Sequence, residues 1–102
     1  MLKLCITFDY ELFLGENLVP EEQILFQPSL ALAEMLSSQG IHSTFFADVC
    51  SVFQYRKYGL TDYPKQFATQ LKTLYSMGHD IQLHLHPNWL HSTFEQGKWQ
   101  IS

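Results

Sequence analysis

Residues 78–89 have the sequence GHDIQLHLHPNW, in which apolar and polar residues alternate with a period of two. This period predicts a β-strand, and side chains two positions apart on a strand share one face. We therefore expect His84 and His86 to project from the same side of a strand that ends at Pro87, because proline cannot donate a ladder hydrogen bond. Imidazoles buried without partners are costly, and a divalent metal ion is a common partner of neutral imidazole. The stretch predicts a metal site at a strand end.

The rest of the chain alternates between strand-like and helix-like stretches. Apolar and β-branched runs predict strands over residues 2–8 and 41–49, the first of them buried on both faces. Apolar stripes, each with a proline at the start and a glycine after the end, predict helices over residues 28–39 and 64–77. The residues expected to face the core from these helices are Leu32, Met35, Leu36, Phe67, Leu71, Leu74 and Tyr75. The order β-α-β-α-β implies right-handed crossovers and a parallel sheet in an α/β fold.

Two stretches lack a steady hydrophobic period and are expected to be loops. They are residues 12–27, with a short helical turn near residues 21–25, and residues 50–62. The residues after the histidine strand are expected to form a tail. No internal repeat, low-complexity segment or linker divides the sequence, so residues 1–102 are expected to form a single domain.

Composition and charge restrict the class of protein. The chain has 102 residues, of which 46% are hydrophobic and 16% charged, as in an ordinary small globular domain. A net charge of −4 gives no electrostatic signal for nucleic acid or for a membrane surface. With no leader and no apolar stretch long enough to span a membrane, a cytoplasmic setting is expected. Cys5 and Cys50 imply no disulfide framework, and Cys5 is expected to be a small buried hydrophobe.

Polar side chains able to bind a metal follow each of the three predicted strands. They are Asp9 and Glu11 after the first strand, Asp48 at the end of the second, and His84 and His86 on the third. In parallel α/β sheets, ligands bind beyond the carboxyl ends of the strands, where these groups are expected to converge. Asp48 has an alternative role, since aspartate also caps the loop that follows it.

Three short motifs occur in the order found in a known enzyme family. TFDYE at residues 7–11 is similar to the family's first motif, a strand followed by Thr-Phe-Asp-Asp, with one residue placed between the two acids. STFF at residues 43–46 is similar to its second-strand signature, and GHDI at residues 78–81, followed by His84, is similar to its Gly-His-Glu-Ile lead into a metal-binding histidine. On these motifs the chain resembles the polysaccharide deacetylase family, also called the NodB-homology or carbohydrate esterase family 4 domain.

This resemblance implies a distorted (β/α) barrel and a divalent cation, zinc or a relative such as cobalt, held by an acid and two histidines. It implies that Asp9 is the catalytic base, Glu11 the acidic metal ligand and His84 the first histidine ligand. The family's second histidine follows the first at the position occupied here by Asn88. The last ligand is therefore expected to be either His86 or Asn88, the latter through its carbonyl oxygen.

The family's later motifs, an arginine-bearing strand and a final histidine, have no counterpart in the sequence. Residues 1–102 are therefore expected to be the N-terminal half of such a barrel, a partial domain whose later strands are missing. A half barrel leaves an exposed sheet edge, and exposed edges pair with other chains. A homo-oligomer formed through that edge is accordingly one expected partnership, beside a carbohydrate or N-acylated small-molecule substrate.

The function implied by the resemblance is amide hydrolysis that removes acyl groups from an N-acylated sugar. Tyr10 and Trp89 flank the expected site, where an aromatic ring can stack on a sugar, although a tryptophan more often serves packing. Two alternatives stay open. One is a non-catalytic domain that dimerises or binds carbohydrate without cutting it, and the other is the same fold acting on a non-sugar amide.

Overall fold

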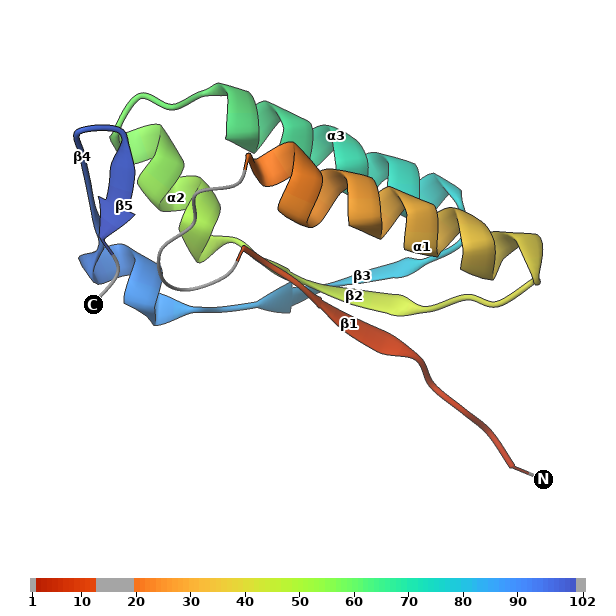
Figure 1. Cartoon of the computed structure of the whole chain (residues 1–102). Coiled ribbons are helices and arrows are strands. Elements are labelled where there is room, and N and C mark those ends of the chain that lie inside the picture. The colour runs from red at the N-terminus through yellow and green to blue at the C-terminus, as the bar shows by residue number, and fades with distance from the viewer. Residues whose placement is uncertain (1, 13–19, 101–102) are drawn as a thin grey trace.

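The computed structural model describes residues 2–12 and 20–100 and has a mixed α/β architecture (Figure 1). Three strands, β1 (Thr7–Tyr10), β2 (Thr44–Asp48) and β3 (Asp80–His84), form a parallel sheet in the order β1-β2-β3. The predicted parallel α/β sheet is confirmed. β2 lies between β1 and β3 and pairs with both. β1 and β3 are the two strands that lead to the expected site.

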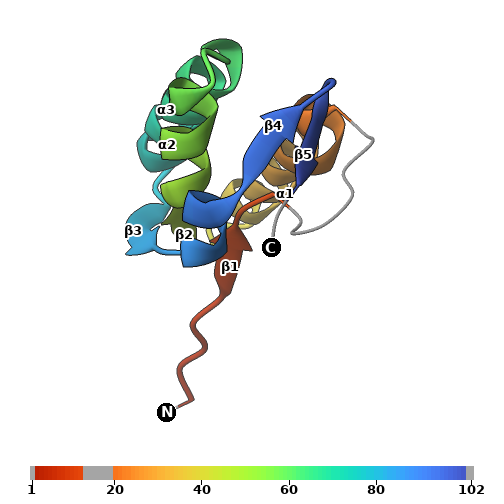
Figure 2. The same ribbon diagram turned by 90° about the vertical axis from the view of Figure 1, so that its left-hand side faces the viewer.

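Helices cover one face of this sheet. A π-helical segment, Glu22–Phe26, continues directly into α1 (Gln27–Ser38), which carries Pro28 in its first turn. α3 (Asp62–Ser76) lies on the same side of the sheet as α1 (Figure 1), and the perpendicular view shows the same arrangement (Figure 2). Both helices end close to the predicted positions, each followed by a glycine, but neither begins at its proline. The π-helical segment precedes α1, and α3 begins at Asp62, before Pro64.

The first strand is shorter and less buried than expected. Its ladder begins only at Thr7, which pairs with Thr44, and the Ile6 carbonyl oxygen accepts the Thr44 N–H at 3.0 Å. Residues 2–5 extend away from the rest of the chain (Figure 1). Leu2 and Leu4 are 85% and 82% exposed, and Cys5 is exposed as well. The expectation of a strand covered on both faces, with a buried Cys5, is therefore wrong. An apolar run favours burial, but it does not specify how many layers of structure will cover it.

Residues 50–62 are not a loop, because α2 (Cys50–Lys57) occupies most of them. The buried side of α2 includes polar residues, which a search for apolar periodicity does not detect. The Ser51 hydroxyl lies 2.9 Å from the Tyr63 hydroxyl, and Gln54 Nε2 donates to the Ser92 carbonyl oxygen at 3.0 Å. These hydrogen bonds satisfy the polar groups that α2 buries against α3 and the C-terminal segment.

The expected tail is ordered over the described residues. A 3-10 helix, Pro87–His91, follows β3 and leads into an antiparallel hairpin of β4 (Thr93–Glu95) and β5 (Lys98–Gln100). The hairpin turn consists of Gln96 and Gly97, whose φ angles of 52° and 75° are typical of a two-residue type I′ turn. The hairpin lies beyond the carboxyl ends of the sheet strands (Figure 1).

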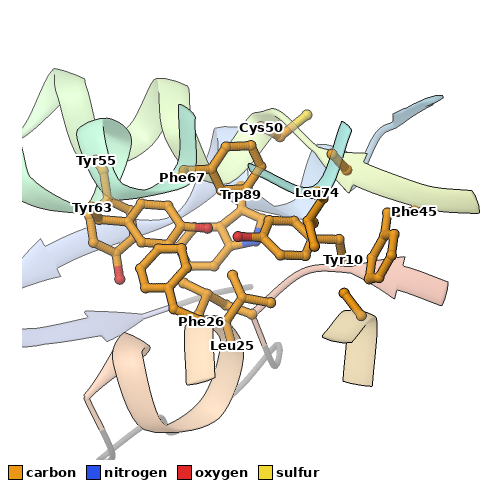
Figure 3. Close-up of a cluster of buried hydrophobic side chains, with 13 residues drawn as sticks. Tyr10, Leu25, Phe26, Phe45, Cys50, Tyr55, Tyr63, Phe67, Leu74 and Trp89 are labelled. Atoms are coloured by element: carbon orange, nitrogen blue, oxygen red, sulfur yellow. The ribbon is translucent and has the colours of Figure 1, made fainter. Parts of the chain in front are cut away.

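Aromatic rings fill the space between the helices and the sheet (Figure 3). Tyr55 is central to this core, with ring centroids 4.2 Å from Tyr63, 4.9 Å from Trp99 and 6.0 Å from Trp89. Of the predicted core stripe, the residues that are buried are Leu36, Phe67 and Leu74. The residues predicted for the core but exposed are Met35 and Tyr75, because each lies at the margin of its stripe and α1 and α3 pack on one side only.

His79 joins α1 to the sheet at the start of β3. Its Nδ1 accepts the Ser43 N–H at 3.1 Å, and its Nε2 lies 3.1 Å from the Ala33 carbonyl oxygen and 3.0 Å from the Ser37 hydroxyl. A carbonyl only accepts and an N–H only donates, so the hydrogen bonds assign the proton to Nε2. These contacts give His79 a structural role between α1 and the sheet.

Candidate metal centre

Glu11, His84 and His86 come together at the carboxyl end of the sheet. Each offers one ligand atom, and these atoms all lie within 4.8 Å of one another. His84 Nε2 is 3.3 Å from Glu11 Oε2, and His86 Nε2 contacts the same carboxylate oxygen. The two imidazole rings have centroids 4.7 Å apart and are nearly perpendicular. The two histidines thus converge on a single oxygen of Glu11.

The sheet register explains this convergence. Phe8, Phe45 and Ile81 are neighbours across the three strands and belong to, or pack against, the core beneath the helices. Because side chains alternate along a strand, Glu11 and His84 lie on the opposite face of the sheet. His86 follows His84 by two positions and keeps the same side, as the period of two predicts. The structure thus confirms the expected proximity of an N-terminal acid, Glu11, to the two histidines.

The donor set fits a divalent cation. Glu11 Oε2 and His84 Nε2 are buried atoms without a hydrogen-bond partner in the described part of the chain. Buried polar atoms left unsatisfied cost about 1–3 kcal/mol each, and a cation would satisfy both. One carboxylate with two imidazoles is a ligand set that zinc enzymes use, with a further position left open for water or substrate. Glu11, His84 and His86 can therefore hold a metal ion.

Asp48 lies behind this group, at the end of β2. Its side chain is completely buried, and its Oδ1 accepts the N–H groups of Cys50 and His86 at 3.0 and 3.1 Å. Asp48 therefore satisfies the first N–H of α2, whose N-cap is Val49, and the expected loop at this position is a helix. Burial raises the pKa of the Cys50 thiol, and the neighbouring Asp48 charge raises it further. No local pattern in the sequence predicts the contact between Asp48 and the backbone of His86.

Asp9 lies on β1 with an exposed side chain. Together with Glu11 it lines a cavity of about 430 Å³ between β1 and the start of α1. The other walls of this cavity are largely apolar and include Ile24, Pro28 and Leu32. The catalytic role of Asp9 stays a prediction.

The expected sugar-stacking roles of Tyr10 and Trp89 are wrong for this structure. Both side chains are only 1% exposed, so neither ring offers a face to a ligand. The Tyr10 hydroxyl donates to Gln70 Oε1, and burial, with a smaller effect of Tyr63, raises the pKa of Tyr10. Trp89 packs edge-on against Trp99 in the aromatic core, with centroids 5.1 Å apart.

Asn88 lies in the 3-10 helix after β3, and its side chain is exposed. His86, the other residue expected as the third ligand, lies in the group with Glu11 and His84. A turn begins at Pro87. It sends the chain into the 3-10 helix immediately after His86, so the alternation that orients the histidines does not extend to Asn88. A role for Asn88 stays a prediction.

Comparisons with protein-family models, curated proteins and solved structures find no match to this chain. The resemblance to polysaccharide deacetylases thus depends on the three sequence motifs alone. Among the helices described within residues 2–12 and 20–100, none is long and apolar enough to cross a membrane.

Proposed function

We propose that this chain forms the metal-binding part of a hydrolase that removes acyl groups from N-acylated sugars, as the resemblance to polysaccharide deacetylases implies. One observation supports this proposal above the others. Glu11, His84 and His86 gather their ligand atoms within 4.8 Å of one another, although they come from opposite ends of the chain. The ligand set favours zinc, with cobalt as a substitute of similar chemistry.

The chain's own residues have distinct tasks in this proposal. Glu11, His84 and His86 hold the ion, which supplies Lewis-acid polarisation of the amide carbonyl when bound. Asp9, exposed and two residues before Glu11, accepts the proton of the attacking water. The cavity between β1 and α1 borders both acids, whereas His84 and His86 do not line it. Amide cleavage then yields a free amine and a carboxylic acid.

A barrel-like setting is the second part of the proposal. The described helices α1 and α3 cover one face of the sheet, and the site residues lie on the other face near the strands' carboxyl ends. In (β/α) barrels the helices form the outer layer and the active site lies at the carboxyl ends of the strands. The sheet β1-β2-β3 corresponds to the first part of such a barrel.

Acetate release from an N-acetylated oligosaccharide, measured with and without added zinc, tests this function. We expect zinc-dependent release by the wild type and its loss in Glu11→Gln and His84→Ala. His91→Ala is the matched control, since His91 is an exposed histidine close in sequence to the site. An N-acetylated peptide assayed in parallel distinguishes the sugar substrate from a non-sugar amide. Equal activity of wild type and Glu11→Gln would refute the proposed metal-dependent mechanism.

Self-association without catalysis is a second candidate function, favoured by the exposed arm of residues 2–6. Leu2 and Leu4 lie on the same side of the extended chain as Phe8 and Tyr10, yet both are almost fully exposed. Antiparallel pairing of two β1 strands about a twofold axis at Ile6 sets Leu4 of one copy beside Phe8 of the second. In this register the exposed leucines of one copy lie against the largely apolar cavity between β1 and α1 of the second copy.

The same register places Lys3 of one copy opposite Asp9 of the second copy, and this pair of opposite charges favours it. Ile6→Cys in a Cys5→Ser background is then expected to form a disulfide-linked dimer under mild oxidation. Ser38→Cys in the same background provides an exposed control at the end of α1. A wild-type monomer by light scattering, with no cross-link at residue 6, would exclude this function.

A further inference from the structure

Asp48 is a buried carboxylate in the middle strand, next to the candidate metal site. It ends β2 and lies opposite His84 in the register. Its side chain is 0% exposed, and it makes no ion pair with a basic side chain among the described residues. Burying a carboxylate away from water costs several kcal/mol unless hydrogen bonds or charges compensate. A carboxylate in this position therefore requires a structural or functional explanation.

The ladder between β2 and β3 supplies that explanation. Val49 N–H donates to the His84 carbonyl oxygen at 3.4 Å, which is the last backbone bond between these segments. In a parallel ladder the next bond would run from the His86 N–H to the Val49 carbonyl oxygen. That carbonyl instead accepts the Phe53 N–H at 3.2 Å, in the first turn of α2. The start of α2 thus removes the acceptor that would hold the backbone at His86.

The side chain of Asp48 takes the place of the lost acceptor. Its Oδ1 accepts the His86 N–H at 3.1 Å and, at the same time, the Cys50 N–H at 3.0 Å. One oxygen thereby joins the start of α2 to the chain just beyond β3. His86 is held at this point although the sheet no longer pairs there, and its imidazole contacts Glu11.

We propose that Asp48 is a positioning residue, which fixes the backbone of His86 so that its imidazole joins Glu11 and His84 in one metal site. In this role Asp48 acts through His86 by way of Oδ1, while its Oδ2 is buried without a hydrogen-bond partner among the described residues. This inference rests on the proposed metal site. It also explains why a carboxylate is buried at the end of β2, where an apolar residue would otherwise suit the surroundings.

Zinc affinity of Asp48 variants, measured by calorimetry, tests the proposal. Asp48→Ala removes the acceptor and is expected to weaken zinc binding by about 10–100-fold, the usual effect of losing a group that orients a ligand. Asp48→Asn keeps an oxygen that can accept both N–H groups and is expected to stay within about threefold of wild type. Cobalt absorption spectra of the two variants should show an altered ligand set for Asp48→Ala alone.

Ser51→Ala controls for a general loosening of α2. The Ser51 hydroxyl is buried, donates to the Asp48 carbonyl oxygen at 3.2 Å and contacts Tyr63, but it does not touch His86. We expect Ser51→Ala to lower stability without changing zinc affinity. Equal losses of affinity in Ser51→Ala and Asp48→Ala, or in Asp48→Asn and Asp48→Ala, would overturn the positioning role.

Amide exchange keeps the inference testable if Asp48→Ala does not fold. In the metal-free wild type, the His86 N–H is expected to be protected from exchange although it lies outside the ladder. Rapid exchange of this N–H would contradict the proposal. A wild type that binds no zinc but protects the His86 N–H would refute the proposed metal function and leave the positioning of His86 by Asp48 standing.

Discussion

His84 Nε2 lies 3.3 Å from Glu11 Oε2, although Glu11 follows the first strand and His84 ends the third. Neither atom has a hydrogen-bond partner among the described residues, and His86 contacts the same carboxylate oxygen. Two ionisable groups that are half-buried and incompletely satisfied indicate a binding site more than a contribution to stability. The sheet supplies the rigid frame, because β2 separates and orients β1 and β3.

Removing the hydrogen bonds of His79 should destabilise the fold without affecting the metal site. His79→Phe keeps an aromatic ring but leaves the Ser43 N–H and the Ala33 carbonyl oxygen without their partner. We expect a loss of about 1–3 kcal/mol in the free energy of unfolding, measured by urea denaturation. His91→Phe, at an exposed position, should leave the free energy unchanged. A His79→Phe variant as stable as wild type would show that these hydrogen bonds contribute nothing net.

Gly78→Ala should cost more stability than Gly59→Ala. Both glycines have positive φ angles, 95° and 74°, which alanine adopts at a cost of about 1 kcal/mol. A Cβ at Gly78 would also lie 3.1 Å from the His42 ring, whereas a Cβ at Gly59 would meet nothing within 4 Å. Replacing His42 with alanine in the Gly78→Ala variant should remove the clash, so that the remaining loss of stability matches that of Gly59→Ala. The loss is measured as the shift of the urea midpoint. Equal effects of the two single substitutions would contradict the steric argument.

Stability should fall steeply above about pH 10, the ordinary tyrosine pKa. Burial, as the main cause, raises the pKa of Tyr10, Tyr55 and Tyr63 in the folded protein. Because of the raised pKa, the folded protein keeps the phenol protons at a pH at which the unfolded chain has released them. The free energy of unfolding is therefore at its full value below pH 10 and falls as the pH rises above it. Each tyrosine contributes a slope of about 1.4 kcal/mol per pH unit.

Urea unfolding at pH 9 and pH 11 measures this slope. Tyr63→Phe is the matched variant, since phenylalanine cannot ionise and loses only the contact with the Ser51 hydroxyl. We expect a shallower decline with pH for Tyr63→Phe than for wild type. Identical slopes would show that Tyr63 ionises as readily in the folded protein as in the unfolded chain.

Trp89 should prove to be a core residue and not a sugar platform. Trp89→Ala is expected to lower the free energy of unfolding by about 3–5 kcal/mol, because it opens a cavity beside Tyr55 and Trp99. Trp89→Phe retains most of the packing and should bind sugar as the wild type does. Loss of sugar binding in a stably folded Trp89→Phe would show instead that the indole ring contacts the ligand.

The sequence predicted the parts of the site that depend on local periodicity. The alternation through residues 80–86 places His84 and His86 on one side, and the parallel order of strands brings Glu11 to them. Parallel strands align their carboxyl ends, so this convergence follows from the element order without any knowledge of packing.

Features that depend on tertiary packing could not be predicted in the same way. α2 was missed because Ser51 and Gln54 are buried through hydrogen bonds to segments distant in sequence. Trp89 was placed at the site because it follows the histidines, whereas the 3-10 helix turns it into the aromatic core. The role of Asp48 depends on where the β2–β3 ladder ends, which no local pattern encodes.

The most direct test of the metal site is zinc binding followed by X-ray absorption at the zinc edge. We expect wild type to bind zinc at micromolar concentration, with two imidazole nitrogens and one carboxylate oxygen at about 2.0–2.2 Å. Glu11→Gln, His84→Ala and His86→Ala should each lose one of these ligands and bind more weakly, whereas His91→Ala should match wild type. No zinc binding by wild type, or an unchanged ligand shell in all three site variants, would contradict the account.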